Sequence, residues 1–327
     1  MNFRTTFSIP KSKPVDYNDA IMLCGSCFVE NIGEKLDNYC FNTMINPFGI
    51  LFDPISLARS LEMIIDRRIF TARDTVFYNN LYHSFFHHSR FSRPNQQEHL
   101  RLINDASEKA HDFLKSATRL IITLGTAWTY RHKERNAVVS SCHKIPQENF
   151  EKYLLSVDEI ITVLSEIFAR LFSFNPNIEI TLTISPVRHI KDGFVENQYS
   201  KSTIILAVKK LIEKKSHPDY FPAYELMMDD LRDYRFYGVD MLHPSTTAVS
   251  YIWERFVETY FDDKTQNILA KVEKIRTASL HRPFHAQSTS YKDFCMKNLT
   301  EIEELMRQFP NASFSGLAEI FKEKLKI

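Results

Sequence analysis

The sequence predicts an α/β fold in which a mainly parallel sheet is covered by helices on both faces. Short apolar runs alternate along the chain with longer segments whose apolar residues recur at helical spacing. The short runs are hydrophobic at nearly every position, as expected for parallel strands that are buried on both sides. The chain has 327 residues, of which 44% are apolar, so it can bury a large core.

The strands of this sheet are the short apolar runs. Residues 20–24 (AIMLC) end at Gly25, and residues 119–124 (RLIITL) end at Gly125. A glycine directly after a strand is suited to a tight turn, because it adopts backbone conformations that other residues avoid. Further strands are predicted at residues 40–45, 178–184 and within 220–233, and a loop or hairpin is predicted around Asn79-Asn80.

The helices are predicted from apolar residues spaced three and four apart. They cover residues 28–37, 54–67, 96–115, 149–172, 197–215 and 246–260, and an extended arm precedes them at residues 1–18. From about residue 262 the strand signals stop, and three helical segments follow that are rich in Lys and Glu. We therefore expect a main domain over residues 1–261 and a helical C-terminal extension over residues 262–327.

The composition excludes several classes of protein. The net charge is +1 and no basic block occurs, so nothing indicates a nucleic-acid partner. No apolar run approaches the roughly 18 residues of a membrane helix, and the first residues lack the apolar stretch of a secretory signal. We therefore expect a cytoplasmic protein without a membrane partner. The 7 glycines form neither of the usual phosphate-binding loops, and we expect no cofactor.

The 5 cysteines indicate neither a disulfide framework nor a zinc site. An odd number in a chain without a secretory signal argues against paired disulfides. Cys24 and Cys27 form a C-x-x-C pair, but no second pair completes a set of four metal ligands. A redox pair remains as a weaker alternative.

Asp240 and His243 are the first candidate catalytic residues. They lie three residues apart in a D-x-x-H-P-S segment that precedes a predicted helix. A carboxylate so placed can hold one ring nitrogen of the imidazole, which leaves the other nitrogen free to accept a proton from a nucleophile. Alternatively, Asp240 caps the following helix and His243 only packs.

Ser26 and Cys27 are the candidate nucleophiles. They follow a predicted strand and begin a predicted helix, where free backbone N–H groups and the helix dipole can stabilise a thiolate or an oxyanion. Alternatively, this is a tight turn in which Ser26 caps the helix and Cys27 fills a small apolar space.

These residues also carry a resemblance to a known family. Gly25-Ser26-Cys27-Phe28-Val29 resembles the motif that names the GSCFA family, with Val29 where the name has alanine. The similar segments cover about residues 20–260. The family is grouped with the SGNH (GDSL-like) hydrolases, which implies a flavodoxin-like three-layer α/β/α sandwich and esterase or acyl-transfer chemistry. The other similar segments are 46–50 (NPFGI), 125–128 (GTAW), 142–144 (CHK), 185–189 (SPVRH) and 220–245.

The resemblance assigns roles to several residues. Asp240-x-x-His243 is similar to the last SGNH block, which implies that His243 is the base and Asp240 orients it. Gly49 resembles the second-block glycine, whose backbone N–H serves the oxyanion hole. Gly125 resembles the start of the third block, but Ala127 stands where that block has an asparagine. Asn46, His143 or a backbone group could replace this donor.

The same resemblance leaves the nucleophile open. Aligning Gly25-Ser26-Cys27 with G-D-S places Cys27 at the nucleophile, and Gly33 then also falls in step. A shift by one residue makes Ser26 the nucleophile instead. A thiolate beside a histidine at a helix N-terminus is a competent nucleophile, whereas the superfamily ordinarily uses serine.

Further residues are candidates for contact with a substrate. Arg188 and His189 follow a strand, where an arginine could hold a carboxylate or phosphate group. His143, Trp128 and His87 are candidate pocket residues. His83, His87 and His88 also suggest a metal site, but no HExxH motif is present, so we expect pocket lining or packing and no metal.

Together these features predict an acyl hydrolase that acts on esters or thioesters, with O-acetyl groups of carbohydrates as candidate substrates. The alternatives are an acyltransferase on the same fold, a non-catalytic carbohydrate-binding module, and a metal-dependent hydrolase built on the histidines. The expected partner is a small-molecule or carbohydrate ester.

Overall fold

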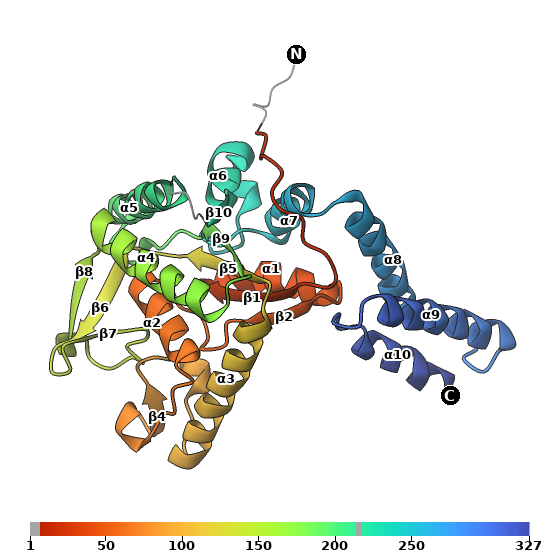
Figure 1. The fold of residues 1–327 in the computed structure, drawn as a ribbon, viewed down its shortest axis with the longest axis horizontal. Coiled ribbons are helices and arrows are strands. Elements are labelled where there is room, and N and C mark those ends of the chain that lie inside the picture. The colour runs from red at the N-terminus through yellow and green to blue at the C-terminus, as the bar shows by residue number, and fades with distance from the viewer. Residues whose placement is uncertain (1–6, 214–217, 327) are drawn as a thin grey trace.

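The centre of the protein is a five-stranded parallel sheet (Figure 1). The computed structural model describes residues 7–213 and 218–326. The strand order is β10-β9-β5-β1-β2, and every neighbouring pair is parallel. This is the flavodoxin-like order, and with helices on both faces it confirms the predicted α/β class. The strands are β1 (Ala20–Gly25), β2 (Asn42–Ile45), β5 (Arg119–Leu124), β9 (Glu179–Ile184) and β10 (Asp219–Phe221).

The two faces of the sheet bury alternate residues of each strand. Along β1, Met22 and Cys24 contribute to one apolar core, and Ile21 and Leu23 contribute to the other. This alternation follows from the period of two along a strand, and it explains why the predicted strands are apolar throughout. The first core is closed by α2 (Pro54–Ile65), α3 (Gln96–Ser116), α4 (Val157–Phe174) and α5 (Phe194–Ile212), and the second by α1 (Cys27–Asn38) and α7 (Thr246–Tyr260).

The C-terminal residues form three helices at one side of the sandwich (Figure 1). They are not separated from its core, because the ring of Tyr17 lies 5.5 Å from Phe309 and 5.6 Å from Phe314 between centroids. Tyr17 also stacks on Phe41 at 4.2 Å. Aromatic packing therefore joins the N-terminal arm, the sandwich and the extension. The helices are α8 (Asp263–Ser279), α9 (Thr289–Gln308) and α10 (Ser315–Leu325).

Two small antiparallel sheets stand beside the main one. In the first, β3 (Thr75–Tyr78) and β4 (Leu81–Ser84) form the predicted hairpin, and Asn79 and Asn80 make its turn with φ of 48° and 61°. Two left-handed residues at these positions are typical of a type I′ turn. The second sheet was not predicted, and its strand order is β7-β6-β8. It comprises β6 (Trp128–His132), β7 (Ala137–Val139) and β8 (Phe150–Leu154).

The second small sheet corrects one predicted helix. The helix predicted over residues 149–172 begins only at Val157, after a capping box made by Ser156 and Glu159. The residues before it form β8, which pairs with β6 over its whole length. The last residues of another predicted helix, 214 and 215, lie outside the described residues, as do residues 1–6 of the predicted arm. Among the described residues no helix is both long and apolar enough to span a membrane.

The fold depends on Gly25 at the end of β1. Its φ is 140°, and a Cβ atom at this position would lie 2.2 Å from the carbonyl oxygen of Thr123 in β5. A side chain here would therefore force the two central strands apart.

We predict that Gly25→Ala lowers the free energy of unfolding by about 2–3 kcal/mol, because it adds both a steric clash and backbone strain. Urea denaturation followed by circular dichroism measures the change. Gly316→Ala is the matched control, since no atom of the described residues, apart from the chain neighbours and the backbone of its own helix α10, lies within 4 Å of its Cβ position. The control should be unchanged or more stable by up to about 1 kcal/mol. Equal stability of both variants would contradict this role of Gly25.

Candidate active site

The candidate site lies at the point of the sheet where the order of the strands reverses. From β1 the chain moves to β2 on one side, whereas β5, β9 and β10 follow on the other side. In open α/β sheets, ligands bind beyond the carboxyl ends of the strands at such a point. Here Gly25 is the last residue of β1, and Gly125 and Ser185 directly follow β5 and β9.

Ser26 and Cys27 differ in their surroundings. Ser26 occupies the N-cap position of α1 without a side-chain capping bond, is fully buried, and its Oγ has no partner among the described residues. Cys27 is the first residue of α1 and is only partly buried. Burial raises the pKa of the Cys27 thiol and Glu30 raises it further, whereas the N–H groups of Cys27 and Phe28 and the charge of Lys201 lower it. Of the two candidate nucleophiles, Cys27 is the more accessible.

Asp240 and His243 form a close pair. His243 Nδ1 donates to Asp240 Oδ2 at 2.6 Å, and the other carboxylate oxygen accepts from the backbone N–H groups of Leu242 and His243. Those backbone bonds, followed by the imidazole, lower the pKa of Asp240 to about 2. Because a carboxylate only accepts, Nδ1 carries a hydrogen, and in the neutral ring the lone pair is then on Nε2.

Asp240 and His243 do not have the alternative roles of a helix cap and a packed core residue. The N-cap of α7 is Ser245, whose Oγ accepts from Ala248. Asp240 therefore does not cap that helix. The side chains of His243 and Asp240 are 52% and 48% exposed, so His243 is not a core residue.

His189 interacts electrostatically with His243 of the Asp240–His243 pair and with Lys201, which acts on Cys27. Burial lowers the pKa of His189 to about 4, and the charges of Lys201 and His243 both contribute. Lys201 also acts on Cys27, so His189 interacts electrostatically with His243 on one side and with the lysine that acts on Cys27 on the other. The adjacent residue, Arg188, donates its backbone N–H to Leu242 O at 3.2 Å and lines a second cavity together with Asp240.

Lys201 was not predicted from the sequence. It is 1% exposed, and its Nζ donates at 2.7 Å to Gly125 O and at 2.7 Å to Ser185 O, which follow two central strands. Its neighbour Ser200 binds the same loop, because its Oγ accepts from the N–H of Ala127 at 2.8 Å. The signal in the sequence is the position of Lys201, three residues before Ile204 on the buried face of α5.

The predicted oxyanion donors are engaged inside the protein. The N–H of Gly49 donates to Asn46 O at 2.7 Å, and the N–H of Gly125 donates to Phe52 O at 2.8 Å. The side chain of Asn46 accepts from the N–H of Gly25 at 2.8 Å and donates to Glu30. In this structure, therefore, the N–H groups of Gly49 and Gly125 are already engaged, whereas the amide of Asn46 has a second N–H donor besides the one given to Glu30.

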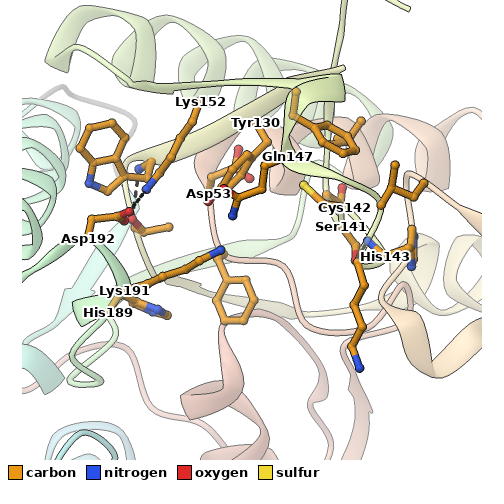
Figure 2. Close-up of a pocket in the computed structure, with 18 of the residues that line it drawn as sticks. Asp53, Tyr130, Ser141, Cys142, His143, Gln147, Lys152, His189, Lys191 and Asp192 are labelled. Carbon is orange, nitrogen blue, oxygen red and sulfur yellow. Dashed lines mark hydrogen bonds and ion pairs between the residues drawn. The ribbon is translucent and has the colours of Figure 1, made fainter. Parts of the chain in front are cut away.

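A cavity of about 610 Å³ opens beside the site (Figure 2). Of the predicted substrate contacts, Trp128, His143 and His189 line it. Figure 2 shows His189 with Lys152 and Asp192 on one side of this space and His143 on the other. The walls are largely aromatic and aliphatic, with polar groups at intervals. They include Phe52, Tyr130, Val139, Ile145, Pro146 and Phe150.

The polar groups of this cavity leave hydrogen-bonding capacity unused. His143 Nε2 contacts Ser84 O at 2.8 Å and must donate to it, so the buried Nδ1 is a bare acceptor without a partner among the described residues. Trp128 Nε1 and His189 Nε2 also lack partners in that part of the chain. Each of these three atoms is itself buried, so a ligand in the cavity would reach it only if the cavity wall moved.

Of the three histidines considered for a metal site, His83 and His87 are buried near the β3–β4 hairpin. His87 is fully buried, lies 4.3 Å from the ring of Phe48 between centroids, and does not line the cavity. His83 bonds Ser92 and Tyr78 with its two ring nitrogens. No group of three or more His, Cys, Asp or Glu residues in the described ranges could hold a metal ion.

Comparison with known proteins returned two matches to family models. The model described as GSCFA family matches residues 20–256, and the one described as GSCFA domain protein, C-terminal domain, matches residues 272–327. A search of curated proteins found no match.

We predict that His143 and His189 stay neutral in the folded protein until the pH falls to about 4, because burial lowers the pKa of each ring to about 4. Ring-nitrogen NMR titration, with His143→Asn and His189→Asn used for assignment, measures both midpoints. Histidine in an unfolded chain has a pKa of about 6.5. The unfolded state therefore binds protons first, and stability should fall as the pH drops from about 6.5 towards 4. Midpoints near 6.5 for both rings would contradict this prediction.

Proposed function

The chain belongs to the GSCFA family, and from this premise we propose that it is an SGNH-like acyl hydrolase that uses Cys27, His243 and Asp240. The observation that carries the proposal is the 2.6 Å bond from His243 Nδ1 to Asp240, because it orients the imidazole and leaves Nε2 of the neutral ring available as a base. The flavodoxin-like strand order and the position of Cys27 directly after β1 are in keeping with an SGNH relationship.

In the proposed reaction, His243 Nε2 removes the proton from Cys27 Sγ. A base is required, because burial raises the pKa of this thiol. The sulfur then attacks the carbonyl carbon of the ester or thioester, and the leaving group takes the proton back from His243. Water hydrolyses the resulting acyl-cysteine with His243 again as the base, which regenerates the thiol.

The negative oxygen of each tetrahedral intermediate needs hydrogen-bond donors. The backbone N–H groups of Cys27 and Phe28 act on the thiol at the N-terminus of α1, where the helix dipole also favours negative charge. We assign the oxyanion to these two groups, because the N–H groups of Gly49 and Gly125 are engaged elsewhere.

The proposed substrate is a carbohydrate-like ester, such as an O-acetylated sugar. The cavity beside the site combines the aromatic side chains of Trp128 and Tyr130 with polar side chains such as Ser141 and Gln147. Aromatic faces and hydrogen-bonding atoms together suit a sugar ring with its hydroxyl groups. If a hydroxyl group in this cavity replaced water as acceptor, the same acyl-cysteine would support acyl transfer.

One observation favours a second candidate, a non-catalytic carbohydrate-binding module. The third SGNH block has Ala127 in place of its asparagine, and Gly49 donates its N–H internally. A binding module would bind a glycan, yet show no turnover and form no acyl adduct with an activated ester.

We predict that Cys27→Ala and His243→Ala each lower kcat/KM for a short-chain aryl ester by about 10³-fold or more. The reason is that the nucleophilic thiol and the basic imidazole act together, so the loss of either one disables both. His285→Ala, which removes an exposed histidine outside the site, is the matched control and should be unchanged. The assay is release of the aryl alcohol at pH 7.5. Loss of activity in Ser26→Ala with retention in Cys27→Ala would overturn the assignment of the nucleophile.

A further inference from the structure

The second cavity has a volume of about 430 Å³ and lies beside the Asp240–His243 pair, because Asp240 lines it. The cavity of Figure 2 is lined by His189, and the preceding residue, Arg188, lines the second cavity. The loop after β9 therefore borders both cavities. Since an ester has an acyl half and an alcohol half, two cavities beside one loop provide a place for each half.

The wall of the second cavity is apolar and unusually exposed. Phe194, Tyr234 and Met241 line it and are 63%, 74% and 51% exposed. Large apolar side chains that gather around one hollow at the surface indicate a site that a ligand covers. Met227 and Met228 also line the cavity, and flexible thioether side chains adapt to ligands of different shapes. This wall suits an aliphatic chain of several carbon atoms, whereas an acetyl group would leave most of the cavity empty.

The backbone around this cavity adopts uncommon conformations. Met227 and Met228 belong to a π-helical segment, Leu226–Leu231, and π-helical turns occur frequently at functional sites. Arg232, which ends this segment, and Met241 have φ of 41° and 59°, in the left-handed region that residues with a side chain rarely adopt. Because such conformations cost free energy and cluster at ligand sites, they support a binding role for this cavity.

The charged groups of the cavity leave one cation without an opposite charge. Three of the four charged side chains that line it have a partner: Asp240 with His243, Asp233 with Arg235 at 3.1 Å, and Arg232 with Asp229 at 3.8 Å. The fourth is the half-buried Arg188. In the described part of the chain, it makes a hydrogen bond from its backbone N–H to Leu242 O and none from its guanidinium group. A planar guanidinium matches the geometry of a carboxylate or phosphate.

We propose that the second cavity binds the acyl half of the substrate, and that this half is an aliphatic chain ending in a carboxylate that Arg188 binds. A carboxylate fits better than a phosphate, because Asp233 and Asp240 also line the cavity and would repel a second negative charge more strongly. The assignment to the acyl half rests on the proposed function, which places the sugar in the cavity of Figure 2. The binding of an aliphatic carboxylate does not depend on that function.

The binding test needs no ester. The full-length protein, labelled with ¹³C at the methionine methyl groups, is titrated with hexanoate or with its neutral counterpart hexanamide. We expect hexanoate to shift the signals of Met227, Met228 and Met241 and to bind about tenfold or more tightly than hexanamide. The signals of Met296 and Met306, in α9, should not move. Equal affinities, or no shift at the three cavity methionines, would overturn the proposal.

The role of Arg188 is tested by substitution. Arg188→Met should abolish the preference for hexanoate over hexanamide, because it removes the cation and retains an aliphatic side chain. Arg101→Met replaces an exposed arginine of α3 and is the matched control, which should bind like the wild type. A folded Arg188→Met protein that still prefers hexanoate would contradict the assignment. If Arg188→Met does not fold, the comparison of hexanoate with hexanamide in the wild type still decides whether the cavity selects an anion.

Ester kinetics separate this inference from the proposed function. The aryl half-ester of hexanedioic acid and the aryl ester of hexanoic acid have the same chain length and differ by one carboxylate. We expect kcat/KM of the wild type to be about tenfold or more higher for the half-ester, and Arg188→Met to remove this difference through KM. Turnover of both esters with equal kcat/KM would overturn the inference and retain the hydrolase. Binding of hexanoate at the cavity methionines without turnover of either ester would retain the anion site and reject the hydrolase.

Discussion

The close approach of β1 and β5 at Gly25 is the constraint on which the site depends. The N–H of Gly25 donates to Asn46 Oδ1 at 2.8 Å, its carbonyl accepts from Leu51 at 3.0 Å, and the next N–H, of Ser26, reaches Thr123 O at 3.1 Å. No side chain fits between these groups. The start of α1 is therefore fixed against the central strands. Cys27 lies at the point where the order of the strands reverses.

This rigidity separates residues that build the site from residues that can act in it. Asn46, Gly49 and Gly125 use their polar groups to hold the loops in place, whereas Cys27 and His243 remain partly exposed. Burial and Glu30 raise the pKa of the Cys27 thiol, while Lys201 acts in the opposite direction. Burial also lowers the pKa of His143 and of His189 to about 4. Acyl transfer is a chemistry that uses such a thiol, because the anion forms only during the reaction.

The sequence was sufficient for the parallel sheet but not for every element around it. Strands β1, β5 and β9 could be predicted because each is a short run rich in apolar and β-branched residues. Strand β8 was mistaken for the beginning of a helix, since Phe150, Tyr153 and Leu154 have helical spacing and only pairing with β6 makes them a strand. Lys201 was not predicted for a related reason. Its position on the buried face of α5 follows from the sequence, but the carbonyl groups to which it donates follow distant strands.

The central claim is that Cys27 carries the acyl group during the reaction. The direct measurement is acid quenching of the wild-type protein during turnover of an activated acetyl ester, followed by peptide mass spectrometry. The account predicts one acetyl group as a thioester on Cys27, accumulating in the wild type and absent from His243→Ala. An acetyl group on Ser26, or turnover without any acyl-enzyme on the peptide that contains both residues, would contradict it.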